Sequence, residues 1–570
     1  MKSRQEALRK IENTEFDVCV IGGGASGAGS ALDAQLRGLR TVLVDAGDFA
    51  CATSSAATKI VHGGVRYLQD AVTHLDIHQY QVVKRALRER IRMLHNAPFL
   101  TRSLEFVVPC FSWFDVVYYG IGLKMYDWIS GKASLFPSRY ISREETIKRF
   151  PSLNTEGLRG AIVYADGQLD DSRYNMALVC TLTESGGEAL NYAKVSGFLA
   201  GPNGKIAAAE VQDQVAGNVF TIRARAFVNA TGPFSDSIRT LAHADIPPRM
   251  RPSKGVHILL PLDGFSDREA LLIPKTEDGR VIFALPWLGR LLIGTTDQEV
   301  SVREEMILKR AEAEYLLRHV NPYLKRPFSV QDIQSGIAGM RPLVGFKGKK
   351  ETKSLVRDDE VEVDSSSGLI SILGGKWTTH RAMAEDTINA VEKYLKGMVT
   401  PSLTPQHPLS GAVGYDQNYP ERLESEFHVP SDTARHLAEK FGTVADKVLA
   451  PTVNNPRLLR RVVPGFPAIT AEVLYCIRYE MGVTIEDILA RRTGLQLFGW
   501  KYAILAAPRV AQCLADELGW SETQRKEAVQ QYIEKINRFL DVAGISARPS
   551  EEGSESRIAV SKEVAEVSRS

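Results

Sequence analysis

FDVCVIGGGASGAGSALDAQLRGLRTVLVDAGDFACATSSAATKIVHGGVRY, residues 16–67, is the stretch that decides the fold. Its continuous apolar run at 16–21 is typical of a strand buried on both faces of a parallel sheet. A helix is expected over 28–36, and a second apolar strand over 41–44. Strand, helix and strand in this order predict the βαβ unit of a Rossmann-like α/β domain.

Three glycines between the first strand and the helix indicate a dinucleotide site. Gly22, Gly24 and Gly27 fit G-x-G-x-x-G. In that motif the first glycine permits a tight turn, the second lets backbone approach a pyrophosphate, and the third lets the helix pack close to the strand. Asp45, about 20 residues further on, is where a ribose hydroxyl would be held. The fingerprint alone does not choose between FAD and NAD. The cofactor-binding residues expected here are Gly22, Gly24, Ala25, Ser26, Gly27 and Asp45.

The segment after Asp45 favours a flavin. It is rich in small hydroxyl side chains and ends in a pair of glycines, a composition that suits backbone running close along a flat isoalloxazine ring. The alternative interpretation is a Ser/Thr-rich turn with a helix cap. The cofactor-binding residues expected in this segment are Thr53, Ser54, Ser55, Lys59, His62, Gly63 and Gly64.

These motifs resemble those of the FAD-dependent glycerol-3-phosphate dehydrogenases, a branch of the D-amino-acid-oxidase-like flavoprotein superfamily. IGGGASGAGSALDAQLRGL, the acid at Asp45 and ATSSAATKIVHGGVRYL carry the similarity, which runs from about residue 15 to about residue 540. It implies an α/β protein, α+β overall, in which an FAD-binding domain is interleaved with an antiparallel-sheet substrate domain and followed by a C-terminal helical domain. It also implies oxidation of sn-glycerol 3-phosphate to dihydroxyacetone phosphate by hydride transfer to flavin N5, with membrane quinone as acceptor.

The resemblance also implies the remaining site residues. Ala230, Thr231 and Gly232, after a hydrophobic strand, would lie beside the adenosine part of FAD. A lone histidine such as His257 is usually a core residue, but its match to the family motif K-G-x-H implies the catalytic base. The expected catalytic residues are His257, Arg341 and Lys376; the substrate-binding residues are Arg66, Tyr67, Arg341, Arg357 and Lys376; and further cofactor contacts are Gly375, Lys376 and Thr378.

The chemistry of these side chains suits a phosphorylated alcohol. Arginines such as Arg341 and Arg357 bind phosphate through two parallel hydrogen bonds, although each taken alone is more often half of a surface ion pair. Gly375 and Lys376 stand at a second glycine-to-helix junction, whose dipole would face negative charge on the reduced flavin. His62 is a second choice for the base, better interpreted as backbone support for the flavin.

Length and composition set further bounds. A chain of 570 residues is too long to fold around a single hydrophobic core, so two or three domains are predicted. A net charge of +2 does not argue for nucleic acid. Six cysteines without a C-x-x-C pair disfavour a metal site and suggest reduced thiols in the cytoplasm. The expected divisions are a lead-in at 1–14, the FAD domain at 15–400 with substrate segments at about 92–165 and 240–360, a linker at 401–420, helices at 421–545 and a disordered tail at 546–570.

Membrane contact is expected to be peripheral. The N-terminus has no apolar core of a signal peptide, and no run of about 18 uncharged apolar residues predicts a transmembrane helix. The cationic helix at 68–94 is either a solvated face or a face toward anionic lipid. The aromatic stretch 111–129 is either a core helix or one that lies in the membrane interface. The family resemblance favours a cytoplasmic enzyme on the inner face of the cell membrane.

Three other functions remain open. The nearest is a glycerol-3-phosphate oxidase, which performs the same half-reaction with oxygen and releases hydrogen peroxide. An amino-acid or amine oxidase of the same superfamily would need one carboxylate-binding arginine and a hydrophobic pocket, which the cluster of cations argues against. A flavin-binding sensor without catalysis is the third. The oligomeric state is open, a homodimer included.

Overall fold

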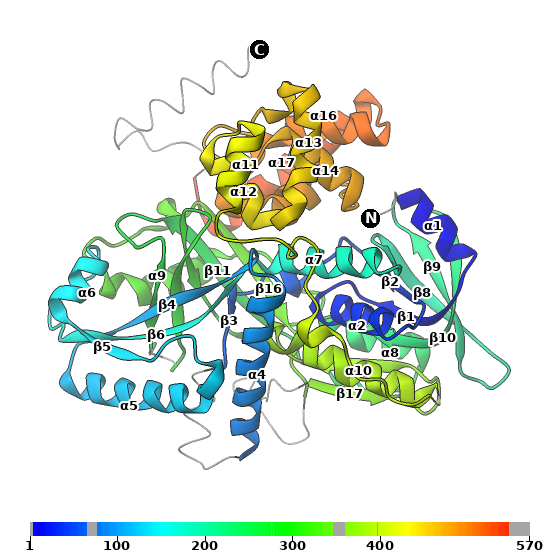
Figure 1. The fold of residues 1–570 in the computed structure, drawn as a ribbon, viewed down its shortest axis with the longest axis horizontal. Coiled ribbons are helices and arrows are strands. Elements are labelled where there is room, and N and C mark those ends of the chain that lie inside the picture. The colour runs from blue at the N-terminus through cyan, green and yellow to red at the C-terminus, as the bar shows by residue number, and fades with distance from the viewer. Residues whose placement is uncertain are drawn as a thin grey trace.

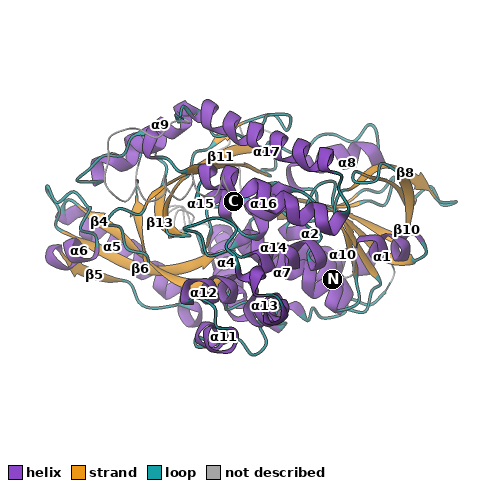
Figure 2. Cartoon of the chain, turned by 90° about the horizontal axis from the view of Figure 1, so that it is seen from above, coloured by secondary structure: helices purple, strands orange, loops and turns teal. Residues whose placement is uncertain are grey.

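Two sheets lie side by side, and a bundle of helices from the C-terminal part of the chain sits above them (Figures 1 and 2). The computed structural model describes residues 4–64, 77–274, 276–277, 279–345, 359–395 and 397–546. Arg66, Tyr67 and Arg357, the first part of the cationic helix expected at 68–94, and residues 547–570 of the expected tail lie outside the described residues.

The first sheet is parallel at its centre. Its order is β18–β10–β1–β2–β7, every neighbouring pair is parallel, and β17 pairs antiparallel with β18 at the edge. The strands are β1 (Glu15–Ile21), β2 (Thr41–Val44), β7 (Glu188–Leu190), β10 (Val219–Asn229), β17 (Asp359–Val363) and β18 (Ile370–Gly374). Val18 to Ile21 are all buried, as the apolar run predicts.

Helices complete this Rossmann-like layer and confirm the predicted βαβ unit. The helix α2 (Ala25–Leu36) connects β1 to β2 and begins at Ala25 rather than Ala28, because extended backbone at Gly24 serves as its N-cap. It packs against α7 and α10. The other helices here are α1 (Arg4–Glu12), α7 (Asp171–Glu184), α8 (Ser235–Ala242) and α10 (His380–Tyr394). The strands β8 (Ala193–Ala200) and β9 (Ile206–Asp213) form an antiparallel meander with β10.

The second sheet runs β15–β11–β14–β13–β12–β4–β6–β3, with β16 beside β11 and β5 beside β6. It is antiparallel as expected, except that β4 and β12 pair parallel. Its strands are β3 (Ile60–Val61), β4 (Thr101–Cys110), β5 (Arg139–Ser142), β6 (Gly160–Leu169), β11 (Ser253–Pro261), β12 (Glu269–Ile273), β13 (Ile282–Trp287), β14 (Arg290–Gly294), β15 (Gln298–Glu299) and β16 (Ser335–Arg341).

Within the described residues, four helices accompany the second sheet: α4 (Ile77–Asn96), α5 (Trp113–Ser130), α6 (Arg143–Arg149) and α9 (Arg310–Val320). The aromatic helix α5 lies along the lower edge of the molecule (Figure 1). A capping box starts it, in which Ser112 and Asp115 exchange hydrogen bonds of 3.1 and 2.9 Å with each other's backbone N–H groups.

The C-terminal helices are not an independent layer. They are α11 (Tyr419–Phe427), α12 (Ser431–Phe441), α13 (Ala445–Asn454), α14 (Thr470–Tyr479), a π-helix (Asp487–Arg492), α15 (Leu495–Phe498), α16 (Trp500–Leu518) and α17 (Glu522–Ala543). Their apolar side chains, Trp500 and Leu495 among them, form one continuous core with Val256 and Ile258 of the second sheet.

Candidate functional site

A cavity of about 410 Å³ opens beyond the carboxyl ends of the parallel strands. It lies where the chain order reverses between β1 and β10, which is where ligands bind in open α/β sheets. Most of its wall comes from the ends of β1, β2, β10 and β18 and the loops that follow them. Its lining includes Ile21, Gly22, Gly24, Ala25, Ser26, Asp45, Thr53, Ser54, Ala230, Thr231, Gly232, Gly374, Gly375, Lys376 and Trp377.

The glycines of the fingerprint keep one wall of this cavity bare. A Cβ at Gly22 would lie 2.6 Å from the Ala230 carbonyl oxygen, and one at Gly24 would lie 2.8 Å from Ser54 Oγ. Gly27 lies behind them, where a Cβ would come within 1.7 Å of the Gly22 carbonyl oxygen. Backbone atoms therefore exclude a side chain at Gly22 and Gly27, and a Cβ at Gly24 would displace the Ser54 side chain. Gly27 sets how closely α2 approaches β1.

The N-terminus of α2 is open to an anion. Gly24 caps the helix without any side-chain hydrogen bond, and the Ala25 N–H donates to Ser54 Oγ at 2.9 Å. Although Ser54 engages the Ala25 N–H, Gly24, Ala25 and Ser26 line the cavity, so the helix directs the positive end of its dipole into it. This arrangement fits the pyrophosphate of a dinucleotide.

Asp45 stands at the tip of β2 and lines the cavity. Its carboxylate accepts the Gly23 N–H at 2.5 Å and the Gly47 N–H at 2.8 Å. Desolvation raises the pKa of Asp45 to about 6, and the two amides lower it only in part. The carboxylate is thus mostly ionised at neutral pH and placed to accept further hydrogen bonds from ribose hydroxyls.

A second glycine-to-helix junction forms the opposite wall. Gly374 and Gly375 both have positive φ, and Lys376 and Trp377 continue the wall. The Trp377 indole N–H donates to the Ser54 carbonyl at 2.9 Å, which ties this junction to the Ser/Thr-rich segment. Thr378 is buried behind the wall and accepts the His62 N–H at 3.3 Å.

The Ser/Thr-rich segment bridges the two sheets, and its residues divide into two groups. Thr53 and Ser54 line the cavity, and Thr53 Oγ1 donates to the Met340 carbonyl of β16 at 2.5 Å. Lys59 is instead buried in an ion pair of 2.5 Å with Asp171, and the Gly63 N–H donates to the Tyr126 hydroxyl at 2.8 Å. The expected cofactor residues that do not line the cavity are Gly27, Ser55, Lys59, His62, Gly63, Gly64 and Thr378.

His257 is buried in β11 between β14 and β16. Its Nε2 lies 3.0 Å from Thr58 Oγ1, and its buried Nδ1 has no hydrogen-bond partner among the described residues. Desolvation, with smaller contributions from Arg341 and Lys59, lowers the pKa of His257 to about 3. The imidazole is therefore neutral at neutral pH.

Arg341 ends β16 next to Pro342, which lines the cavity. Its guanidinium donates to Thr295 Oγ1 and to the Thr296 carbonyl, both at 2.9 Å, and forms an ion pair of 3.2 Å with Asp297. These acceptors hold the group in one orientation. Because β11 and β16 are paired, His257 and Arg341 lie on neighbouring strands, with His257 opposite Ile337 and Arg341 opposite Ser253. Neither residue lines the cavity itself, which Pro342 reaches.

Sequence reasoning missed part of the wall. The missed lining residues include Lys194, Val195, Pro233, Phe234, Ser237, Ile238, Leu241 and Pro342. The spacing of Ser237, Ile238 and Leu241 on a helix directly after Ala-Thr-Gly is a signal that could have identified them. The loop carrying Asp48 gave no such signal, since the two arginines that pair with Asp48 are more than 400 residues away in the chain.

Comparison with known proteins gives consistent results. A family model described as FAD dependent oxidoreductase matches residues 17–381, and one described as the C-terminal domain of alpha-glycerophosphate oxidase matches 402–525. The chain is 40% identical to the mitochondrial glycerol-3-phosphate dehydrogenase of Rattus norvegicus over 94% of this chain and 75% of that protein. It is 40% identical to the corresponding Arabidopsis thaliana enzyme over 94% of this chain and 89% of that one.

One solved structure resembles the chain over nearly its whole length. It is the glycerol-3-phosphate dehydrogenase of Bacillus halodurans complexed with FAD, with a TM-score of 0.76 and 29% identity over 96% of this chain and 99% of that chain.

Proposed function

Because the chain belongs to the glycerol-3-phosphate dehydrogenase family of FAD-dependent oxidoreductases, we propose that its cavity holds FAD and that His257, Arg341 and Lys376 serve the oxidation of sn-glycerol 3-phosphate to dihydroxyacetone phosphate. The observation that carries the proposal is the junction at Pro342. Pro342 lines the cavity that fits a dinucleotide, and it directly follows Arg341 at the end of β16. The paired strand β11 carries the neutral imidazole of His257.

The chain's own backbone and small side chains would hold the cofactor. The first turn of α2 would bind the pyrophosphate, Asp45 the ribose, and the wall at Ala230 to Gly232 the adenosine end. Bound FAD supplies a two-electron acceptor for the hydride that leaves C2 of the substrate.

Arg341 is proposed to bind the substrate's phosphate. Its guanidinium is preorganised by Thr295, Thr296 and Asp297, so little side-chain entropy is lost on binding. The ion pair with Asp297 already balances the single positive charge of Arg341. The phosphate dianion of the substrate therefore needs further cations. We propose Lys376, Arg66 and Arg357 for them, and Tyr67 as a further hydrogen-bond donor.

His257 is proposed to take the proton of the C2 hydroxyl. A neutral imidazole has the free lone pair that a base requires, but a pKa of about 3 makes it a weak base in the substrate-free protein. Desolvation is the main cause of this low pKa, and a phosphate dianion bound at Arg341 would offset only the smaller contribution of that arginine. Substrate binding is therefore expected to strengthen the base.

Anaerobic titration of the purified holoprotein with sn-glycerol 3-phosphate tests the proposal. We expect the flavin absorbance near 450 nm to bleach with one equivalent of substrate. Glycerol, which lacks the phosphate, is the control and should bleach the flavin far less. A flavin that stays oxidised with glycerol 3-phosphate, or one that D-amino acids bleach equally well, would contradict the proposal.

The electron acceptor distinguishes a glycerol-3-phosphate dehydrogenase from a glycerol-3-phosphate oxidase. We propose membrane quinone, which accords with the relatives' names as dehydrogenases. The model matched at 402–525 is named for an oxidase, and this observation favours oxygen as the alternative. Measuring quinone reduction against hydrogen peroxide release in one reaction decides between them.

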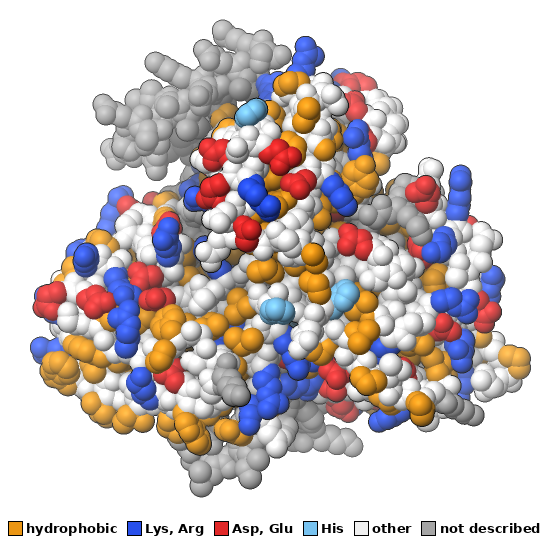
Figure 3. Space-filling model, in the orientation of Figure 1, with side chains coloured by type: hydrophobic (Ala, Val, Ile, Leu, Met, Phe, Trp, Pro, Cys, Tyr) orange, Lys and Arg blue, Asp and Glu red, His pale blue; other side chains and the backbone are white. Residues whose placement is uncertain are grey.

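Membrane contact is proposed through one face of α5. Trp113, Phe114, Ile121 and Trp128 are 61, 74, 59 and 77% exposed, and apolar side chains gather along this edge of the molecule (Figure 3). No described helix combines the length and apolarity needed to cross a bilayer. We propose that α5 lies in the lipid interface on the inner face of the cell membrane, with its rings at headgroup depth.

A further inference from the structure

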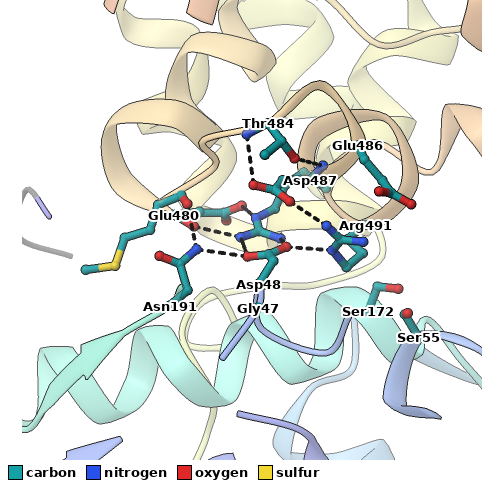
Figure 4. A network of polar contacts seen from close by, with 12 residues as sticks. Gly47, Asp48, Ser55, Ser172, Asn191, Glu480, Thr484, Glu486, Asp487 and Arg491 are labelled. Carbon is teal, nitrogen blue, oxygen red and sulfur yellow. Dashed lines mark hydrogen bonds and ion pairs between the residues drawn. The ribbon is translucent and has the colours of Figure 1, made fainter. Parts of the chain in front are cut away.

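A buried ionic network joins the C-terminal helices to the loop that follows β2 (Figure 4). Asp48 of this loop is fully buried and receives Arg491 Nε at 2.6 Å and the two terminal nitrogens of Arg492 at 2.8 Å each. Asn191 donates to the same carboxylate at 3.1 Å. The bidentate geometry of Arg492 is the strong form of this interaction.

The network extends beyond Asp48 and its charges balance. Arg491 also pairs with Asp487 at 2.5 Å, and Arg492 approaches Glu480 at 3.4 Å. Glu480 in turn receives both terminal nitrogens of Arg173, from α7, at 2.6 and 2.8 Å. Three carboxylates thus face three guanidinium groups, all of them buried. Burial would raise the pKa of Asp48, but Arg492 and Arg491 outweigh it and hold that pKa at about 2.

The loop held in this way is a wall of the FAD cavity. Asp45, Ala46, Gly47, Ala50, Cys51 and Ala52 line the cavity on either side of Asp48. Its backbone is tied to the glycine-rich turn, since the Ala50 N–H donates to the Gly23 carbonyl at 3.2 Å. A displacement of Asp48 would therefore move Asp45 and the turn that faces the pyrophosphate.

We propose that Arg491 and Arg492 are positioning residues for FAD: from the C-terminal helices, they hold Asp48 so that the loop at 45–52 keeps the shape that the adenosine half of the cofactor needs. The proposal rests on the proposed binding of FAD in this cavity. Both arginines lie on a π-helix, a rare conformation that is frequent at functional sites. Loss of either would leave a buried carboxylate short of a partner.

The test measures FAD release from the full-length holoprotein. Serial dilution, read by the rise in flavin fluorescence, gives the dissociation constant of FAD, and displacement by ADP gives the affinity for the adenosine half alone. Arg492→Met is expected to raise both constants at least tenfold, and Arg492→Lys less. Asp48→Asn keeps the side-chain volume and should reproduce the effect if Arg492→Met fails to fold.

The control is Glu472→Gln, which breaks the buried pair of 2.9 Å with His436 inside the C-terminal helices and touches no residue of the loop. It should lower the thermal midpoint and leave the dissociation constant of FAD within about twofold. Unchanged FAD affinity in folded Arg492→Met and Asp48→Asn proteins, an equal loss in Glu472→Gln, or an unchanged ADP constant would overturn the proposal. None of these measurements requires turnover, so their failure is distinct from failure of the proposed oxidation.

Discussion

At the scale of single residues, the site depends on charges whose environments differ sharply. The pKa of Asp45 is about 6, the imidazole of His257 is kept neutral, and fixed acceptors hold the guanidinium of Arg341. Each of these environments makes a measurable prediction.

FAD affinity should fall in mild acid. Desolvation sets the pKa of Asp45 at about 6; among the charges that act on it, Asp48 raises this pKa and Arg491 lowers it. The ionised carboxylate accepts hydrogen bonds from ribose more strongly than the protonated acid does, so protonation below pH 6 should weaken FAD binding, by at most about tenfold per pH unit. Asp45→Asn should bind FAD more weakly at pH 7.5 and lose this pH dependence. A wild-type dissociation constant that stays flat from pH 7.5 to 5 would contradict the role of Asp45.

Replacing Arg341 by Ala should impair substrate capture. Removing a preorganised cation from a phosphate site typically costs about 2–5 kcal/mol, seen as a fall in kcat/KM with FAD still bound. Arg251→Ala is a matched control, because Arg251 forms an ion pair with Glu299 at the protein surface. Exposed pairs contribute about 1 kcal/mol or less, so this variant should stay near wild type. Equal kinetics for the two variants would argue against Arg341 as the phosphate ligand.

His257→Gln should slow flavin reduction without altering the spectrum of bound FAD. In the wild-type enzyme the pH profile of kcat/KM reports groups of the free enzyme, where the pKa of His257 is about 3. We therefore expect no limb of the profile near pH 6.5 from this residue. Stopped-flow reduction of the variant at the wild-type rate would show that another group is the base.

At the scale of elements, local patterns predicted most of what the structure shows. The run 16–21, the glycines and the strand 41–44 led to β1, α2 and β2 because strand burial and turn geometry depend on neighbouring residues. Pairings between distant segments could not be predicted. The parallel contact of β4 with β12 joins residues more than 160 positions apart, and nothing in either strand specifies the other.

The candidate site shows the same division. Gly22, Gly24 and Asp45 could be located because one short motif contains them all. Lys59 was predicted to contact the cofactor because of its charge. It forms an ion pair with Asp171 instead, and that pair depends on the position of α7, which the sequence around Lys59 does not indicate. The environments that set the pKa of His257 come from three separate strands, so they follow only from the tertiary structure.

The exposed face of α5 should bind lipid. Replacing Phe114 and Trp128 by Ser removes two rings that are 74 and 77% exposed, each worth about 1.5–3 kcal/mol when buried in an apolar environment. Co-sedimentation with anionic phospholipid vesicles should fall at least tenfold, while FAD content stays unchanged. Val453→Ser, at a residue 69% exposed on the C-terminal helices, is the control. Equal sedimentation of all three proteins would exclude this helix face as the membrane contact.

At the scale of the whole molecule, the C-terminal helices pack against the two sheets as part of one structural unit. Trp500 donates its backbone N–H to the Gln334 carbonyl at 3.0 Å, and the Arg290 guanidinium stacks 3.9 Å from the centre of the Phe498 ring. With the Asp48 network on the other side, these helices contact both sheets.

The chain is therefore expected to unfold as one unit despite its size. The shared core and the buried ion pairs lose their partners together if the C-terminal helices detach, because Val256 and Ile258 would be exposed and Asp48 left unpaired. Urea unfolding followed by flavin fluorescence and by far-ultraviolet circular dichroism should give coincident transitions. Arg290→Met, which removes a contact between the second sheet and α15, should shift both transitions to lower urea by the same amount. Release of FAD at one urea concentration and loss of helix at a clearly higher one would show instead that the C-terminal helices fold independently.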